Sequence, residues 1–550
     1  MNHMKAVART LALSSIALCA IVTTGAQTPT SKAQAYPRPA SWAGSNEMLR
    51  HYFVYWGYPR YEAHPRYLGV LRGSWREIGV QYGQRAGDLI RRVFEGWFAE
   101  KVQVQGSTGA VLDYVHQEER YYQALVPEAL AAMQGMAEGA GPELDKSAYA
   151  AAMSHYEKIL VINSYFGLGV PGGVDTKTGA APGRALQRGG RVGIPGQAGD
   201  GELGGCSGAV ILAKGTADGK VIHVSSEDQH FFPQEYLVTY VVRPADPNAH
   251  PYTVTDSAGE IGSEHAINDR GVVVSGYAGG SVDIGARRSG LDWQVGVWYA
   301  TAFASDAKQA VSLLTVGRPA YREKSGNKIV IGKCARGANW LVSDTSEAYV
   351  VESIPADLNG VARYAVRRPG DAGEAGDYLV TTNNVEAPDS YDERNVHDTN
   401  HAMRSHGSAF RAPAYGLGVN GGNGTRFMTL MTLIKRNYGK ITPEMVKGWR
   451  TAHYVYDVNG IRHDRLDVPG VGSVSPHLIP GVSTLCAHTS GPAGVDTYLG
   501  VNTYVSLSVA QDLTVWRTVG RPCEWKGPWD AISFRSSGAA APAVAGSARD

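Results

Sequence analysis

An abrupt change of composition divides this chain of 550 residues into two unlike parts. Residues 167–205 are dominated by Gly, Pro, Ala and Arg, as in the run GLGVPGG, and they contain no apolar periodicity. A stretch of this length without regularly spaced apolar side chains cannot bury a core, so we expect an exposed, mobile connection. It ends at Gly205, and Cys206 begins a sequence rich in short strands. The chain therefore has to fold as a helical part and a sheet part that meet at this junction.

The part before the connection is expected to be helical from about residue 67 to residue 160. Ser74 and Glu77 have the spacing of a capping box and mark a helix start. A second helix is expected at about residues 112–138. Apolar residues at helical spacing predict the core of this part, namely Ile78, Tyr82, Leu89, Val93, Trp97, Val126, Leu130, Met133 and Met136.

After Cys206 the pattern is one of short strands separated by turns, with Asp218-Gly219 as a hairpin signal. Strands are expected at 209–213, 221–225, 236–242, 272–275, 339–343, 348–352, 378–382, 483–488 and 513–519. Helices are expected at 305–315, at 425–438 and after Thr442-Pro443-Glu444, where Thr is the cap and Pro is the first helical residue. Helices between two runs of strands indicate a layered α+β body.

The first 35 residues have the order of a secretory signal: a basic start, an apolar run from Leu11 to Val22, and Ala33-Gln34-Ala35 as the cleavage site. The apolar run is too short to span a bilayer, and no later run reaches about 18 residues. We therefore expect a secreted or periplasmic protein without a membrane span. Because 52 Lys and Arg balance 51 Asp and Glu, nucleic acid is not expected as a partner.

Cys206 is the residue with the most chemical information. If its thiol attacked the Gly205 carbonyl and the chain were cut there, the new chain would begin with a free α-amine beside the thiol. An α-amine has a pKa of about 7.7 to 8.0, so it can take the thiol proton and activate the sulfur. The alternative is that Cys206 is a small buried hydrophobe, which is the usual role of an unpaired Cys. From spacing alone the second interpretation is favoured.

Three other groups of residues were weighed as sites. The Gly-rich stretch from Gly416 to Thr425 is interpreted as a helix entry, because no strand and acidic partner frame it as a dinucleotide fold requires. His397, His401 and His406 have a spacing compatible with a metal, but their polar neighbours favour a solvated loop. His223, Asp228 and His230 are not expected to be metal ligands, since residues 223 and 230 face opposite sides of a strand. No metal site and no cofactor are predicted, and the disulfide pairing among Cys334, Cys486 and Cys523 is left open.

The segment from Gly205-Cys206-Ser207 through the Asp218-Gly219 turn to Asp228 resembles the start of the mature chain in a known family. This is the acyl-CoA:6-aminopenicillanic acid acyltransferase (isopenicillin N acyltransferase)-like family of N-terminal nucleophile (Ntn) hydrolases, relatives of bile salt hydrolases. Further similar segments follow in the family's order: Gly73–Gly79 with Gly83, Pro127–Gly139, Asp256–Gly262, Asn268–Val272, Leu379–Asn383, Val482–Leu485 and Val519–Pro522. The resemblance covers about residues 67–534.

The resemblance implies the fold, the domains and the roles of three residues. The fold would be α+β, a four-layer αββα sandwich of two antiparallel sheets with a helical pro-segment. Cys206 would be the nucleophile, Asp228 would orient the amine and thiol, and the Asn383 amide would form part of the oxyanion hole, with Asn384 as a rival. With the resemblance, residues 36–166 would be the helical pro-segment, residues 206–535 the catalytic domain, and Gly205–Cys206 the self-cleavage site at the end of the connection at 167–205. The sequence pattern itself predicts the signal peptide at 1–35, and the Ala, Gly and Ser content predicts a disordered tail at 536–550.

The sequence also departs from its relatives at two positions. Bile salt hydrolases have an Arg where Ser225 stands, and the penicillin-forming enzyme has an Arg where Pro480 stands. These departures affect which substrate would be bound, and they leave the chemistry possible.

The function expected from the resemblance is hydrolysis or transfer of an acyl group from a small-molecule amide, through a thioester on Cys206 and without metal or cofactor. The two chains produced by self-cleavage would remain associated. Two alternatives stay open. One is a secreted Cys/His peptidase in which His223 or His488 activates the Cys206 thiol without chain cleavage, and the other is an inactive binding protein on the same scaffold.

Overall fold

The computed structural model describes most of the helical and sheet parts of the chain, and every described residue belongs to the compact unit Ala43–Asp550. The described residues are 65–164, 206–229, 236–262, 264–278, 293–315, 321–322, 328–329, 338–354, 363–371, 374–383, 417, 421–468, 472–479, 482–487, 489–490, 496–497, 501–523, 525 and 528–534. The expected signal, connection and tail, and with them Gly205, lie outside this part of the chain.

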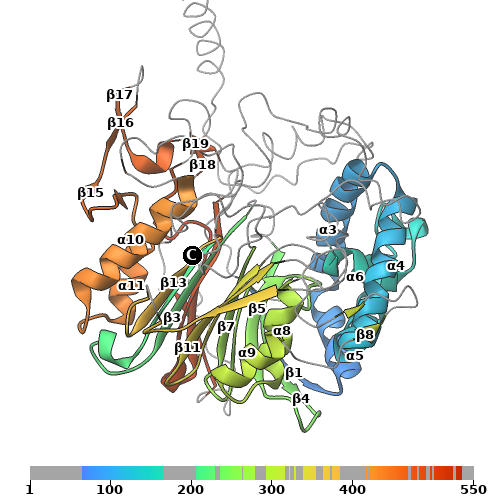
Figure 1. Cartoon of the computed structure of the whole chain (residues 1–550). Coiled ribbons are helices and arrows are strands. Elements are labelled where there is room, and N and C mark those ends of the chain that lie inside the picture. The colour runs from blue at the N-terminus through green and yellow to red at the C-terminus, as the bar shows by residue number, and fades with distance from the viewer. Residues whose placement is uncertain are drawn as a thin grey trace, which may run out of the picture. The chain divides into compact units, whose positions relative to one another are not determined.

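The helical part contains four α-helices, shown in blue to green in Figure 1: α3 (Trp75–Gln105), α4 (Thr108–Leu125), α5 (Pro127–Leu144) and α6 (His155–Asn163), with a 3₁₀ turn at Ala150–Ala152. The expected capping box is confirmed, because the Ser74 side chain accepts from the Glu77 N–H and the Glu77 carboxylate accepts from the Ser74 N–H. All of the apolar residues predicted for this core are buried.

Two predictions for the helical part are wrong. Residues 67–73 are not helical but belong to strand β1 (Arg66–Gly73), which ends where Gly73 adopts a φ of +113°. The single helix predicted at 112–138 is two helices, α4 and α5, separated at Val126. Val126 has φ −141° and ψ 61° because Pro127 excludes the helical conformation from the residue before it.

Glycines allow α3 and α5 to pack unusually closely. A Cβ on Gly79 would lie 2.0 Å from the Ala132 carbonyl oxygen, and one on Gly135 would lie 2.1 Å from that of Arg76. Side chains at these positions would push the helices apart, so glycine is required by contact rather than by backbone conformation. This accounts for the glycines in two of the segments that carry the sequence resemblance.

An eight-stranded sheet has the order β1-β4-β5-β6-β7-β10-β11-β12. Its strands after β1 are β4 (Leu237–Pro244), β5 (Tyr252–Ser257), β6 (His265–Asn268), β7 (Val273–Ala278), β10 (Ala338–Ser343), β11 (Ala348–Ile354) and β12 (Arg363–Arg367). Neighbouring strands are antiparallel, except that β1 runs parallel to β4. The helical part therefore contributes an edge strand to the sheet of the second part.

A six-stranded antiparallel sheet has the order β13-β2-β3-β20-β21-β22. Its strands are β2 (Ser207–Ile211), β3 (Ile222–Gln229), β13 (Tyr378–Thr381), β20 (Val501–Val509), β21 (Thr514–Val519) and β22 (Asp530–Ser533). Short strand pairs occur at β8 (Tyr321–Arg322) with β9 (Lys328–Ile329), β14 (Val455–Tyr456) with β15 (Arg462–His463), β16 (Leu466–Val468) with β17 (Gly472–Val474) and β18 (Thr489–Ser490) with β19 (Asp496–Thr497).

Side chains that alternate along β2 contribute to two separate cores. Val210 packs with Tyr277 and Leu341 of the eight-stranded sheet, in a core between the two sheets. Ala209 and Ile211 instead pack in a core that includes residues of α10 (Gly421–Asn437) and α11 (Pro443–Trp449). Strand β2 is therefore buried on both faces, which explains the apolar run from Ala209 to Ile211.

Helices α8 (Trp293–Phe303) and α9 (Ala307–Thr315) contact strands of the eight-stranded sheet (Figure 1). Gly276 of β7 lets α8 approach, because a Cβ there would lie 2.3 Å from the Trp293 ring. Among the described helices none is both long and apolar enough to cross a membrane. The described residues thus form a mixed α and β fold with several sheets, in agreement with the coarse α+β prediction.

Most predicted strands and helices of the second part are confirmed to within a few residues. The strand predicted at 483–488 is wrong for residues 483–487, and residue 488 lies outside the described part of the chain. There several backbone groups are hydrogen-bonded by side chains instead of by a neighbouring strand. The Ser483 N–H donates to Thr425 Oγ1 over 3.2 Å, and the Ala487 N–H donates to Asn502 Oδ1 over 2.7 Å. Strands β5, β6, β12, β20 and β22, the four short strand pairs and helix α8 were not predicted.

Candidate functional site

Cys206 lies directly before β2, at one end of the six-stranded sheet, and its side chain is buried in the core between the sheets. The next residues allow this burial. A Cβ on Gly208 would lie 1.9 Å from the Tyr277 hydroxyl, so glycine is needed for Tyr277 to pack beside β2. The thiol is therefore held in a fixed, largely dehydrated place.

Strand register brings the other two predicted site residues to the same end of the sheet. β13 pairs with β2 so that Thr381 lies opposite Gly208, and extension of this register sets Asn383 opposite Cys206. On the other side of β2, Ser207 pairs with Ser226 of β3, which puts Asp228 just beyond Cys206. Residues distant in sequence converge here because three adjacent strands end together.

Arg426 of α10 connects all three predicted residues. Its Nη1 donates to the Cys206 carbonyl oxygen over 2.8 Å and lies 3.4 Å from Asp228 Oδ2, and its Nη2 donates to Asn383 Oδ1 over 3.4 Å. The Arg426 and Asp228 side chains are 2% and 0% exposed, so this ion pair is shielded from water. Because the Asn383 oxygen accepts from Arg426, the orientation of the Asn383 amide is defined.

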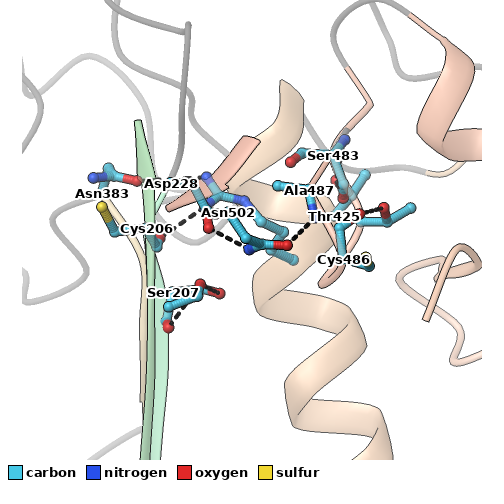
Figure 2. A network of polar contacts seen from close by, with 12 residues as sticks. Cys206, Ser207, Asp228, Asn383, Thr425, Ser483, Cys486, Ala487 and Asn502 are labelled. Carbon is cyan, nitrogen blue, oxygen red and sulfur yellow. Dashed lines mark hydrogen bonds and ion pairs between the residues drawn. The ribbon is translucent and has the colours of Figure 1, made fainter. Parts of the chain in front are cut away.

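Asn502 of β20 holds the second oxygen of Asp228. Its Nδ2 donates to Asp228 Oδ1, and its Oδ1 accepts from the Ala487 N–H. Figure 2 shows this path, which runs from Cys206 and Asp228 through Asn502 to the segment that carries Ala487 and Cys486. Both oxygens of the Asp228 carboxylate are thus engaged by buried donors.

A second buried arginine, Arg450 at the end of α11, fixes the residue after the thiol. Its Nη2 donates to the Ser207 carbonyl oxygen over 3.0 Å, and its Nη1 donates to Ser207 Oγ over 2.8 Å and to Ser226 Oγ over 3.3 Å. Burial lowers the pKa of Arg450 to about 10, so the side chain remains a cation at neutral pH. Ser225 lies in β3 next to Ser226 and pairs with Gly208 of β2.

The thiol of Cys206 is neutral in the uncut chain at neutral pH. Burial, and then the negative charge of Asp228, raises the pKa of Cys206 to about 12, although a hydrogen bond from the Asp228 backbone N–H and the charge of Arg426 act in the opposite direction. A neutral thiol is a weak nucleophile. Chemistry at this sulfur therefore requires a group that accepts its proton.

Two neighbouring carboxyl groups are candidates to accept the thiol proton. Burial raises the pKa of Asp228 to about 6 despite the opposing charges of Arg426 and Arg450. Burial also raises the pKa of Glu227 to about 7, with hydrogen bonds to Glu264 and Tyr504 opposing the shift. Carboxyls with pKa values in this range can exchange protons near neutral pH.

His223, one proposed base of the alternative peptidase, does not contact Cys206. Its Nδ1 and Nε2 each lie 2.8 Å from a serine hydroxyl, Ser343 Oγ and Ser275 Oγ, in the core between the sheets. Ser275 Oγ in turn lies 2.7 Å from His265 Nδ1. Burial lowers the pKa of His223 to about 3, so this imidazole is a weak base held in a structural chain of hydrogen bonds.

Other residues considered from the sequence lie outside the described part of the chain: Gly205, Asn384, His230, Cys334, His397, His401, His406 and His488. Within the described part, sequence reasoning missed Arg426, Arg450 and Asn502. The two arginines lie in or next to amphipathic helices, where a charged residue normally marks the solvated face, so the pattern carried no sign of their burial. Asn502 lies in a strand that was not predicted.

Comparison with known proteins gives a weak fold likeness and no sequence match. No protein-family model and no curated protein matches the chain. A conjugated bile acid hydrolase from Clostridium perfringens is 11% identical, with a TM-score of 0.32 over 60% of this chain and 92% of that chain. A penicillin V acylase from Agrobacterium tumefaciens is 12% identical, with a TM-score of 0.31 over 60% of this chain and 87% of that chain. An N-acylethanolamine-hydrolyzing acid amidase ortholog from Caenorhabditis elegans is 13% identical, with a TM-score of 0.22 over 32% and 68%.

Proposed function

We propose that this chain is a self-cleaving Ntn hydrolase of the αββα type that hydrolyses or transfers an acyl group from a small-molecule amide. The observation that carries the proposal is the convergence of Cys206, Asp228 and Asn383 at one end of the six-stranded sheet, joined by the guanidinium of Arg426. A buried thiol beside a carboxylate, an amide and a cation is arranged for nucleophilic chemistry and not simply for packing.

The first step of the proposal is cleavage of the Gly205–Cys206 bond. The Cys206 sulfur attacks the Gly205 carbonyl carbon, a carbon–sulfur bond forms, and the carbon–nitrogen bond breaks while the thiol proton passes to the departing nitrogen. Water then hydrolyses the thioester, which leaves a carboxylate on Gly205 and restores the thiol. Asp228, with a pKa of about 6, is the proposed proton carrier in the uncut chain.

In the second stage the new α-amine of Cys206 becomes the base. It accepts the thiol proton as sulfur attacks the substrate amide, and it returns a proton to the leaving amine. Asn383 is the proposed donor to the oxyanion of the tetrahedral intermediate. Water or a second amine then takes the acyl group from the thioester, which gives hydrolysis or transfer respectively.

The helical part would remain bound to the second part after cleavage. Strand β1 pairs with β4 inside the eight-stranded sheet, and the Asn163 side chain donates to the Gly259 carbonyl oxygen over 2.9 Å and accepts from the Ile261 N–H over 2.8 Å. The two Asn163 contacts are buried, and neither they nor the β1–β4 pairing involves residues of the connection at 167–205. Secretion before cleavage is part of the same proposal, on the basis of the signal-like first 35 residues.

The experiment that tests the proposal is the intact mass of the purified protein, followed by end sequencing. We expect two chains that copurify, the larger beginning with Cys206-Ser207-Gly208. Cys206→Ala should remain one inactive precursor, whereas Cys206→Ser should still cleave slowly because a hydroxyl can make the same acyl shift. A fully active protein that is one uncut chain would exclude the proposal and favour the Cys/His peptidase, and an uncut inactive chain would favour a binding protein.

A further inference from the structure

Three residues from separate segments bring a nitrogen and two sulfur atoms together outside the proposed catalytic centre. They are His453, which follows α11, Cys486 in the segment 482–487, and Cys523 in the turn after β21. Their possible ligand atoms all lie within 4.8 Å of one another. Both cysteines are thiols, and Cys486 is buried while His453 and Cys523 are half-buried. The cluster is therefore enclosed but reachable from solvent.

The surrounding contacts hold the cluster in place. The Cys486 N–H donates to the carbonyl oxygen of Ala452 over 3.2 Å, which ties Cys486 to the residue next to His453. The His453 ring lies against the His477 ring with centroids 4.3 Å apart, and His477 Nδ1 is 2.8 Å from Ser475 Oγ. Packing of this kind restricts the imidazole orientation, as the surroundings of a metal ligand commonly do.

We propose that His453, Cys486 and Cys523 form a zinc site. Two thiolates and a neutral imidazole are a ligand set that Zn²⁺ prefers, and a water molecule would supply the fourth position of the tetrahedron. With Zn–S bonds of about 2.3 Å and Zn–N bonds of about 2.0 Å, ligand atoms lie roughly 3.5 to 3.8 Å apart. The cluster has to contract by about 1.3 Å at most, which the two half-buried side chains allow.

Zinc binding to this cluster balances in charge. One Zn²⁺, two thiolates, a neutral imidazole and a water molecule sum to zero, and binding releases the two thiol protons to solvent.

A disulfide between Cys486 and Cys523 is the competing chemistry, and it would require an external oxidant such as a second disulfide. The imidazole favours the metal, because a disulfide gives His453 no role. The zinc site would also hold the Cys486–Ala487 segment, whose Ala487 N–H is bonded to Asn502, the partner of Asp228. This last link rests on the proposed function, whereas the metal binding does not.

The test uses the full, purified protein, reduced and freed of metal, and titrated with Co²⁺ alone and then with Zn²⁺ alone. We expect one equivalent of Co²⁺ to give the sulfur-to-cobalt charge-transfer band and the intense visible bands of a tetrahedral site, and Zn²⁺ to abolish them. Cys523→Ser and His453→Ala should weaken Zn²⁺ binding at least about a hundredfold, since even outer-shell partners are worth about 10- to 100-fold. Cys206→Ser and His250→Ala, which lie outside the cluster, should bind as the wild type does.

Circular dichroism of Cys523→Ser and His453→Ala distinguishes a lost ligand from a lost fold, and the wild-type Co²⁺ spectrum does not depend on any variant. Absence of a thiolate–cobalt band in the reduced wild type would overturn the zinc site. So would protein isolated without metal whose mass and peptide map show a Cys486–Cys523 disulfide. Zinc binding in an uncut, inactive chain would leave the metal site standing while the proposed function failed.

Discussion

The guanidinium of Arg426 donates a hydrogen bond to the carbonyl oxygen of Cys206 over 2.8 Å. This contact joins the first turns of α10 to the residue directly before β2. The same guanidinium also reaches Asp228 and Asn383, so one side chain sets the relative positions of three residues from three strands. Arg426 is therefore a positioning residue in the proposed mechanism.

Arg426→Met should reduce both stability and self-cleavage. Removal of one partner of a buried ion pair leaves an uncompensated charge on Asp228, and such losses cost about 3 to 5 kcal/mol. Arg436→Met is the matched control on the same helix, because Arg436 contacts the exposed Gly460 carbonyl oxygen and the Tyr456 ring. Denaturant unfolding and intact mass provide the two measurements. Equal stability losses in the two variants would contradict the assigned role.

Asp228→Asn should impair cleavage more than it impairs folding. The negative charge of Asp228 raises the pKa of the Cys206 thiol, so this carboxylate cannot act by stabilising a thiolate. It acts, in the proposal, by accepting and returning a proton, which an amide cannot do. We expect uncut precursor to accumulate in Asp228→Asn, whereas Asp218→Asn in the exposed hairpin turn should cleave normally. Normal cleavage of Asp228→Asn would mean that another group carries the proton, and Glu227 would be the first candidate.

Asn383→Ala should leave most of the protein cleaved but slow acyl transfer by about a hundredfold or more, as loss of one oxyanion donor does. The change should appear in kcat rather than in KM, because the oxyanion forms only in the reaction. The measurement is turnover of a panel of small acylated amides by the cleaved protein. Wild-type turnover in this variant would move the role to Asn384 or to a backbone N–H.

The family resemblance predicted Cys206, Asp228 and Asn383 as site residues. Strand register brings these residues to one end of the six-stranded sheet, and their catalytic roles stay predictions. Cys206, Asp228 and Asn383 each follow or precede a recognisable strand, and strands that pair in register bring their ends together. The residues that join them were not predictable, because Arg426 and Arg450 occur in or beside helices whose patterns do not distinguish a solvated from a buried cation. Their burial depends on tertiary contacts with β2 and β3.

For the fold as well, features set by neighbouring residues were predictable from the sequence, and features set by distant segments were not. The capping box at Ser74 and the Pro443 helix start are local signals, and both are confirmed. β1 was predicted as part of a helix because its eight residues become a strand only by pairing with β4, a segment far away in sequence. The predicted strand at 483–488 failed for the converse reason, since side chains of Thr425 and Asn502 take the backbone groups that a strand would use.

His223 should lower the free energy of unfolding as the solution becomes acidic. Burial lowers the pKa of His223 to about 3, so as the pH falls below 6.5 the unfolded chain binds a proton at this residue while the folded chain does not. The folded state therefore loses about 1.4 kcal/mol per pH unit from this group between pH 6.5 and about 3. Asp228 and Glu227 have the opposite effect. Because their pKa values are raised in the folded state, their protonation stabilises the folded protein as the pH falls.

The comparison of wild type with His223→Gln isolates the histidine, because both proteins contain the same carboxyls. The stability penalty of the variant should shrink by about 2 kcal/mol between pH 6.5 and pH 4.5 in denaturant unfolding. Parallel profiles for His223→Gln would mean that His223 is protonated in the folded protein.

The identity of the catalytic base is the last testable point. If the base is the α-amine of Cys206, activity should rise with pH through a single ionisation near the unperturbed value of about 7.7 to 8.0, since the amine must be neutral to accept the thiol proton. Burial would lower this pKa and the charge of Asp228 would raise it. Chemical blocking of the α-amine should abolish turnover while the Cys206 thiol remains titratable.

A histidine base gives the opposite pattern: amine modification would be harmless, and His223→Ala or His488→Ala would be inactive. Because both ring nitrogens of His223 are engaged by serine hydroxyls, His488→Ala is the decisive variant of the pair.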